Sequence, residues 1–430
     1  MEKRYVSREG IELYCYPNER LHGFYLSLFV RAGTLIENED SQGITHALEH
    51  VLIRGVNARS GGTLYRTLDR LGLDFNASTY RDVVQFYISG SAARFAEGAD
   101  ILCRLLLPLS LSGKDIEAER RRIKAEIREA DERSTLSGFT AACLYPDSPG
   151  RFSILGTRGT VNRMSRRALE AYRASVMCCE NIFFYATGCV SDANMQALCT
   201  LVDSYSVPHG MRRDNVLPPP VALFRRDGAV HVRRADYTAV RMSFDIDTTV
   251  LGAPECDLLY DALFTGYNAR FFLELSEQRG ICYDIAGGID RYRNLGCFYF
   301  SFECGGRELY DAVDASVDLL LRCKRELLAE QTLPYAVYVD NADMLLDDAA
   351  ELGFTMAYDT KLLGLPYASL EDRKAAYRRI TPQRLREVCR AIFRPDACTL
   401  TVKGDPARID TARLHGMLMR LGEDEATENG

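Results

Sequence analysis

The sequence predicts an α+β fold with two homologous halves, each a largely antiparallel sheet covered by helices. Alternating apolar and polar residues, the pattern of a half-buried strand, occur at residues 23–33 and again at residues 238–247. Segments with a helical spacing of apolar residues follow each of them, and further strand patterns come next. Strands grouped in runs and separated by runs of helices favour antiparallel sheets, so we expect an α+β fold.

The expected elements follow the same order in both halves. In the first half, a strand, two helices, two strands and a long helix are expected at residues 23–33, 43–55, 61–72, 74–78, 83–90 and 91–107. The second half repeats this order at residues 238–247, 254–264, 269–280, 282–288, 296–305 and 307–327. A glycine also stands between the last strand and the long helix in both halves. An internal duplication is the simplest explanation.

The length of the chain predicts more than one domain. A chain of 430 residues is too long for one ordinary hydrophobic core. Residues 218–220 are consecutive prolines among charged neighbours, and such a stretch can continue neither a helix nor a central strand. We therefore expect one domain at residues 1–212, a linker at residues 213–226 and a second domain at residues 227–430.

Composition and charge argue against several classes of protein. A hydrophobic fraction of 47% and a charged fraction of 26% are typical of a globular chain. The net charge of -7 leaves no overall basic character, so duplex nucleic acid is not expected as the main partner. We find no apolar signal segment at the start and no run of about 18 apolar residues, so we expect no membrane contact and a cytoplasmic location.

The 14 cysteines are scattered along the chain and form no C-x-x-C pair. Most stand among apolar neighbours, which predicts buried, reduced thiols. The adjacent Cys178 and Cys179 are the exception that a thiol titration could probe. An iron–sulfur or thiol-based function is disfavoured because the cysteines are not clustered.

The segment "GITHALEHVLIRG", residues 43–55, has the pattern of a metal-binding helix. His46 and His50 are four residues apart and share one face of a helix, so their imidazoles can converge on one point. Glu49 lies on nearly the same face and can reach a water held there. Zinc prefers nitrogen ligands in a tetrahedron with one open position when it is catalytic, so a third ligand must come from elsewhere.

The third ligand is expected from the helical, highly charged segment at residues 115–132. Glu119 and Glu126 are two helical turns apart and point the same way, so one can bind the metal while the other orients the site. The apolar side of this helix is formed by Ile116, Ile123 and Ile127. Taken alone, a histidine pair is more often structural and a charged run is more often a solvated surface.

The H-x-x-E-H pattern is the inverted zinc signature, and its surroundings resemble the M16 metallopeptidase family, the group of pitrilysin, insulysin and mitochondrial processing peptidase. The similar segments are "FVRAGTLIENEDSQGITHALEH", "NASTYRDVVQFY", "EAERRRIKAEI", "ILGTRGTVNRMS" and "NARFFLELSEQRGICYDI". They extend over almost the whole chain. The resemblance implies the LuxS/MPP-like metallohydrolase fold, with a zinc-bearing N-terminal half and a C-terminal half that holds no metal.

The resemblance also implies roles for individual residues. His46, His50 and Glu126 would be the zinc ligands, Glu49 the general base, and Glu119 a carboxylate that supports the ligands. The strand at residues 74–78 resembles the family's active-site edge strand, to which an extended peptide can add. Asn76 and Ala77 would contact the substrate there.

One position departs from the family pattern. The family usually has an arginine and a tyrosine seven residues apart in the stretch that matches "LSEQRGICY"; here Tyr283 is present, but Ser276 takes the arginine's place. Arg279 is nearby, but it would leave the helix end in another direction. A serine cannot supply the cationic fork that steadies a peptide carbonyl. We therefore expect a second M16-like chain as partner, with a heterodimer favoured and a homodimer possible.

The function expected from this resemblance is that of a zinc-dependent endopeptidase. It would cleave short or unfolded peptides in a clamshell chamber that the partner chain completes. The alternative is a non-catalytic scaffold or peptide-binding subunit of an M16-like assembly, since a shared fold does not determine activity.

Overall fold

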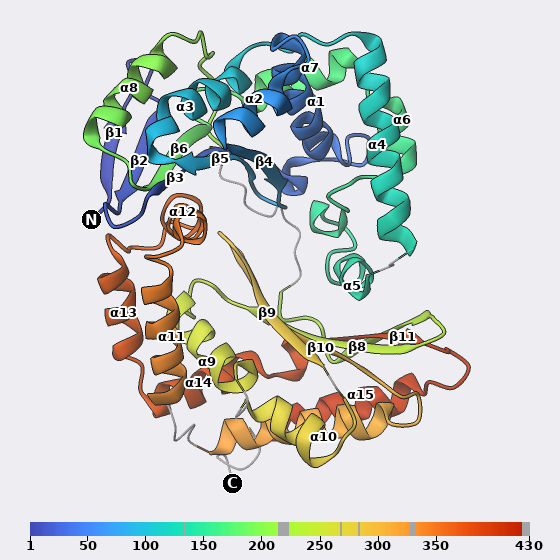
Figure 1. Cartoon of the computed structure of the whole chain (residues 1–430). Helices are drawn as coiled ribbons and strands as arrows, with labels where there is room; N and C mark the ends of the chain where they lie inside the picture. Colours follow the sequence, from blue (N-terminus) through green and yellow to red (C-terminus); the bar gives the residue numbers. More distant parts are fainter. Residues whose placement is uncertain (133–134, 214–222, 267–268, 283, 327–331, 424–430) are drawn as a thin grey trace. The chain divides into compact units, whose positions relative to one another are not determined.

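The computed structural model describes residues 1–132, 135–213, 223–266, 269–282, 284–326 and 332–423 (Figure 1). The chain forms two compact units. The first comprises Met1–Ser134, Phe152–Val216 and Asp343–Ser369, and the second comprises Thr135–Arg151, Leu217–Ala342 and Leu370–Gly430. Each unit therefore takes one short segment from the other half of the sequence, an exchange that the expected domain limits did not include.

The first unit contains a six-stranded sheet in the order β1-β2-β6-β3-β5-β4. Only β2 and β6 pair in parallel, and the other neighbours are antiparallel. The strands are β1 (Lys3–Val6), β2 (Glu12–Pro17), β3 (Gly23–Val30), β4 (Asp74–Thr79), β5 (Val84–Ser91) and β6 (Ile182–Gly188).

The second unit contains a five-stranded sheet in the order β7-β11-β8-β10-β9. Its strands are β7 (Ala229–Arg234), β8 (Thr238–Ile246), β9 (Ile285–Tyr292), β10 (Leu295–Cys304) and β11 (Cys398–Gly404). Again only one pair, β7 and β11, is parallel. This order matches β2-β6-β3-β5-β4 strand for strand and direction for direction, which confirms the expected α+β fold with two homologous halves.

The helices repeat along the chain in the same way. The first half contains α1 (Ile44–Arg59), α2 (Leu64–Leu71), α3 (Phe95–Cys103), α4 (Gly113–Glu132), α5 (Leu136–Leu144), α6 (Arg158–Arg163), α7 (Arg166–Val176) and α8 (Asp192–Asp203). The second contains α9 (Ala253–Phe264), α10 (Leu309–Arg325), α11 (Thr332–Met344), α12 (Ala349–Ala357), α13 (Leu370–Arg378), α14 (Pro382–Ile392) and α15 (Thr411–Met419), with π-helical turns at Phe272–Gln278 and Tyr358–Leu362. In this order α9 corresponds to α1, α11 to α4, and α12 to α5.

Each sheet has one apolar face, which forms the core of its unit. In the first unit, Leu26 and Leu28 of β3 and Ile88 of β5 are fully buried in a cluster that includes residues of α1 and α3. In the second, Met242 of β8 and Phe300 of β10 are equally buried. Strand alternation places every second side chain on this face, so the same alternation that predicted the strands also builds both cores.

The exchanged segments carry equivalent helices. Helix α12 packs on β3 and β6 of the first unit, while α5 packs on the corresponding strands β8 and β11 of the second. In the first unit, Thr187 donates to the carbonyl of Ala349 at 2.5 Å, and Tyr358 donates to Asp82 at 2.8 Å. The face of each sheet opposite its core is thus covered by a helix from the other half of the sequence.

No helix in the described part of the chain is long and apolar enough to cross a membrane. All 14 cysteines are free thiols. Cys178 and Cys179 are both buried, and burial raises the pKa of each thiol.

Candidate metal centre

The start of helix α1 is held by its backbone and by a buried carboxylate. Gly43 precedes the helix with a φ of 80°, and a Cβ there would lie 2.6 Å from the carbonyl oxygen of Leu155. The Glu37 side chain, 4% exposed, accepts hydrogen bonds from the backbone N–H groups of Gly43 (2.8 Å) and Thr45 (2.9 Å). These bonds satisfy backbone N–H groups that have no partner within the helix at its start. A negative charge at this end also interacts favourably with the helix dipole.

Two histidines of α1 and one glutamate of α4 converge. The Nε2 atoms of His46 and His50 are 3.2 Å apart, and the two rings meet edge to face. Glu126 Oε2 lies 3.6 Å from His46 Nε2 and 3.4 Å from His50 Nε2. Among the described residues, these three form the one group of potential ligands close enough to share an ion.

The three distances fit a tetrahedral zinc site. Ligand atoms about 2.0–2.2 Å from zinc stand about 3.3–3.6 Å from one another in a tetrahedron. Two imidazoles and one carboxylate are a donor set found in catalytic zinc sites, with the fourth position open. The Glu126 side chain is 34% exposed, so the cluster is partly open to solvent on the side of Glu126.

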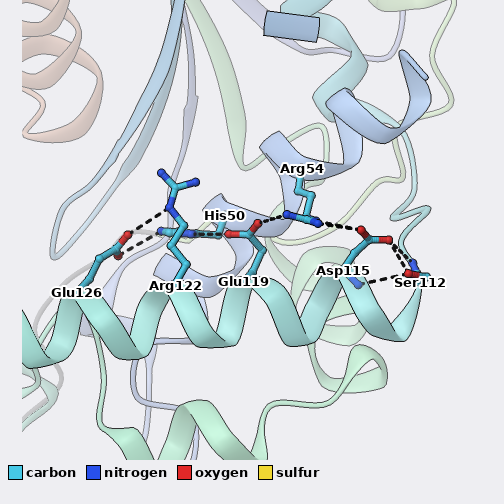
Figure 2. Close-up of polar contacts among 7 residues, drawn as sticks. All are labelled: His50, Arg54, Ser112, Asp115, Glu119, Arg122 and Glu126. Carbon is cyan, nitrogen blue, oxygen red and sulfur yellow. Dashed lines mark hydrogen bonds and ion pairs between the residues drawn. The ribbon is translucent and has the colours of Figure 1, made fainter. Parts of the chain in front are cut away.

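Glu119 contacts the Nδ1 side of the His50 ring, opposite the Nε2 atom that faces Glu126 (Figure 2). His50 Nδ1 donates to Glu119 Oε2 at 3.0 Å, and Arg54 donates to Glu119 Oε1 at 2.8 Å. This geometry separates the two carboxylates that the sequence left as alternatives. Glu126 faces the converging Nε2 atoms, whereas Glu119 accepts a hydrogen bond from Nδ1 of the His50 ring. A carboxylate bonded in this way orients the ligand histidines of metal sites.

The electrostatics of the two histidines differ. Burial and the neighbouring His50 lower the pKa of His46 to about 4. Burial also acts to lower the pKa of His50, but hydrogen bonds to Glu119 and Glu126 outweigh it and raise this pKa to about 9. The hydrogen bond from His50 lowers the pKa of Glu126. Without metal, one proton therefore stays on this cluster at neutral pH.

Glu49 lies beside this cluster on α1 and is bonded to the edge strand. Thr79, the last residue of β4, donates its hydroxyl hydrogen to Glu49 Oε2 at 2.5 Å. Burial raises the pKa of the Glu49 carboxyl, against the opposing effect of the Thr79 bond. A carboxylate with a raised pKa can both accept and return a proton near neutral pH.

Strand β4 is the edge of the first sheet as described and pairs with β5 alone. Tyr80 N–H bonds the carbonyl of Val83 at 2.8 Å, so hydrogen-bonded pairs alternate from there and the backbone N–H of Ala77 points away from β5. The side-chain oxygen of Asn76 accepts this N–H at 2.9 Å. Asn76 is exposed and Ala77 is partly buried, so the free edge presents the backbone of Ala77.

The second unit contains the segment in which Ser276 takes the place of the family's arginine. Tyr283 lies outside the described residues. Ser276 is partly buried in the π-helical turn Phe272–Gln278. The Arg279 guanidinium bonds Glu274 at 2.9 Å, and Arg322 bonds the other oxygen of that carboxylate at 2.5 Å. Arg279 is thus engaged by a neighbour on its own segment.

Sequence reasoning did not single out Glu37, Arg54 or Thr79. Glu37 and Thr79 stand within family-like segments, and Arg54 follows His50 by one helical turn. The partners of Arg54 and Thr79 are distant in sequence, whereas Glu37 bonds backbone groups only six and eight residues away. The sequence carried a signal for Arg54, as a cation on the helix of the histidine pair and near a carboxylate-rich helix.

Comparison with known proteins shows similarity to one peptidase family. Residues 18–145 match the family model described as Insulinase (Peptidase family M16). An uncharacterized zinc protease of Mycobacterium tuberculosis is 24% identical over 319 residues, which is 72% of each chain. The mitochondrial-processing peptidase subunit beta of Caenorhabditis elegans is 25% identical over 435 residues, covering 92% of this chain and 88% of that protein. The chain is thus similar to proteins of peptidase family M16 over most of its length.

The fold is shared with a solved structure of similar size. The crystal structure of a peptidase M16 inactive domain from Pseudomonas fluorescens superposes with a TM-score of 0.82 at 14% identity, covering 94% of this chain and 98% of that chain. At this identity the likeness concerns the fold alone. Because that domain is described as inactive, the M16 fold does not by itself establish activity, which has to be inferred from the residues of the site.

Proposed function

We propose that this M16 chain is a zinc-dependent endopeptidase that acts on short or unfolded peptides. The observation that carries the proposal is the convergence of His46 Nε2, His50 Nε2 and Glu126 Oε2 at distances of 3.2–3.6 Å, with Glu49 on the same helix. This arrangement is suited to an ion with one open position and a base beside it.

The residues around the site have separate tasks in this proposal. Zinc held by the three donors would lower the pKa of a coordinated water and polarise a peptide carbonyl. Glu49 accepts a proton at its carboxylate and passes it to the leaving amine. Its burial supports this role, because a raised pKa increases its affinity for the proton. Thr79 holds Glu49 Oε2, so the carboxylate keeps one orientation.

Glu119 supports the ligand role of His50. By accepting the Nδ1 hydrogen it selects the tautomer in which the Nε2 lone pair faces His46 and Glu126. Its second oxygen is occupied by Arg54, which leaves the first for His50.

The free edge of β4 is the proposed binding surface for the peptide. An extended substrate would pair with the outward-facing backbone of Ala77 in place of the Asn76 side-chain oxygen, which now accepts the Ala77 N–H. Main-chain hydrogen bonds provide affinity with little dependence on side chains, which suits varied or unfolded peptides. Because Thr79 ends the same strand, a peptide bound there lies close to Glu49.

The proposed enzyme works with a second M16-like chain that completes a clamshell chamber. Ser276 lacks the cation that family peptidases place there, and Arg279 is bonded to Glu274. We therefore favour a heterodimer in which the other chain provides the arginine, with Tyr283 as a catalytic residue from this chain; a homodimer is the alternative. One relative is itself named a beta subunit, which supports a partner.

A non-catalytic scaffold or peptide-binding subunit is the second candidate. The inactive M16 domain of the same fold favours it. The complete set of ligands and base argues against it, because a subunit kept only for packing has no physical need for these groups.

Metal analysis and a cleavage assay test the proposal together. The purified protein should bind one zinc per chain, measured by plasma mass spectrometry. It should then be incubated with a peptide library, alone and with any M16-like chain encoded nearby, and the cleavage sites mapped by mass spectrometry. Zinc binding with cleavage only in the presence of the second chain is expected. Absence of both zinc and cleavage would favour the scaffold.

A further inference from the structure

Arg54 joins the metal-binding helix α1 to the carboxylate helix α4 at two points (Figure 2). Its Nη1 donates to Glu119 Oε1 at 2.8 Å, while its Nε and Nη2 donate to Asp115 Oδ1 at 3.1 and 3.0 Å. Arg54 stands one helical turn after His50, so both residues meet Glu119 from the same face of α1. The guanidinium fork therefore spans the carboxylates of two successive turns of α4.

The contacts continue to the beginning of α4. Asp115 Oδ2 accepts hydrogen bonds from the backbone N–H of Ser112 (3.0 Å) and from its hydroxyl (2.6 Å). A continuous line of polar contacts thus runs from His50 through Glu119, Arg54 and Asp115 to Ser112. It ties the histidine to the first turn of the helix that carries Glu126.

The two oxygens of Glu119 have one strong partner each. The side chain is 7% exposed, with Oε1 on Arg54 and Oε2 on His50. A carboxylate held at both oxygens keeps its plane, which keeps the His50 ring in one orientation. Losing Arg54 would release one oxygen and let the carboxylate turn.

The same contacts set the position of Glu126. Glu126 lies seven residues after Glu119 on α4, a rise of about 10.5 Å along the same face. A helix anchored at Asp115 and Glu119 is determined in rotation and in axial position against α1. Glu126 then lies close to the Nε2 atoms of His46 and His50, although it makes no contact with Arg54 itself.

We infer that Arg54 is a positioning residue of the metal centre: it holds Glu119 against His50 and holds α4 at the height at which Glu126 meets the histidine pair. The inference rests on the proposed zinc-binding function and extends it to a residue outside the ligand set. Lysine cannot replace Arg54 fully, because a single ammonium group does not reproduce the planar fork that contacts two carboxylates.

The test compares three variants with the wild type. Arg54→Met removes the fork and keeps much of the side-chain length, Arg54→Lys keeps the charge, and Arg121→Met removes an exposed cation from α4 as a matched control. Zinc affinity is measured by competition with a chelator of known affinity. Arg54→Met should bind zinc about 10- to 100-fold more weakly, Arg54→Lys should show a smaller loss, and Arg121→Met should match the wild type.

A second readout uses the metal-free protein. Long-range ¹H–¹⁵N spectra at one fixed pH report the tautomer and hydrogen bonding of the histidine rings. Arg54→Met should shift the His50 ring signals, and Arg121→Met should not. A residue important only for stability would lower the unfolding midpoint and leave zinc affinity and these signals unchanged in the folded fraction. That result would overturn the inference.

The two proposals fail in different ways. If the wild type binds no zinc, the proposed function fails, and the His50 signals of the metal-free variants still decide the role of Arg54. If Arg54→Met does not fold, Asp115→Asn replaces it, because it weakens the outer end of the fork and keeps the Arg54–Glu119 bond. An intermediate shift of the His50 signals is then expected, and wild-type signals would contradict the inference.

Discussion

Thr79 donates its hydroxyl hydrogen to Glu49 Oε2 across 2.5 Å, so the last residue of the edge strand β4 contacts a carboxylate of helix α1. The strand proposed to bind substrate and the proposed base are therefore in direct contact. A peptide that adds to β4 would lie against the strand that holds the base in place.

Replacing Thr79 by valine should slow turnover without removing metal. Thr79→Val keeps the shape and loses the hydroxyl, so Glu49 loses the partner that orients it. We expect kcat to fall about tenfold or more, a part of the roughly 10²–10⁴-fold that a positioned base contributes, with KM and zinc content nearly unchanged. Steady-state kinetics with a cleaved peptide would measure this. Thr79→Ser restores a hydroxyl and should recover most of the activity.

Replacing Glu49 by glutamine should separate metal binding from catalysis. The amide is of similar size but cannot accept the proton, so Glu49→Gln should bind one zinc and lose about 10²–10⁴-fold in kcat/KM. Zinc content and peptide cleavage are measured on the same preparation, beside the wild type. Full activity in a zinc-loaded Glu49→Gln protein would remove Glu49 as the base.

Zinc binding should release about one proton at neutral pH. In the metal-free protein, hydrogen bonds to Glu119 and Glu126 overcome the effect of burial and raise the pKa of His50 to about 9, so this ring is protonated below that pH. Burial lowers the pKa of His46 to about 4, so its ring is already neutral. Since zinc needs neutral imidazole, its affinity should rise about tenfold per pH unit toward pH 9.

Calorimetry in buffers of different ionisation enthalpy would count that proton. The titrations should be run at pH 7 and again above pH 9, where the released fraction should decline. Zinc affinity that is independent of pH between 6 and 9 would show that His50 is neutral before the metal arrives.

The isolated N-terminal half should be unstable. A fragment of residues 1–212 lacks Asp343–Ser369, which belongs to the same compact unit. Phe29 would lose its neighbour Phe354, and Asp82 would lose the Tyr358 hydroxyl. An aromatic pair is worth about 0.5–1.5 kcal/mol beyond the area that it buries. The fragment also loses the area that the rest of the segment buries, so a large part of a typical stability is lost. Thermal unfolding followed by circular dichroism should show a lower or absent transition.

A fragment in which residues 343–369 are joined to residues 1–212 by a flexible linker is the matched comparison. It should regain a cooperative transition, because the helix that covers β3 and β6 is restored. Equal stability of the two fragments would mean that α12 contributes little to the first unit.

The parts of the site that follow from local geometry were predictable. The spacing of His46 and His50 places two imidazoles on one helical face, and strand alternation predicts both sheets, because these relationships depend on residues close in sequence. The exchange of α5 and α12 was not predictable in this way. It depends on which sheet each helix covers. Each helix is close in sequence to the strands of one sheet but packs on the other, and no local pattern indicates that choice.

By itself, the sequence determined the duplicated α+β plan, the histidine pair with its adjacent glutamate, and the helix that carries two further carboxylates. Only the tertiary structure decided that Glu126 meets the Nε2 atoms while Glu119 bonds Nδ1, and that Thr79 and Arg54 complete the surroundings. The physical reason is that helical periodicity makes Glu119 and Glu126 equivalent, and only the packing of α4 against α1 gives each carboxylate a different side of His50.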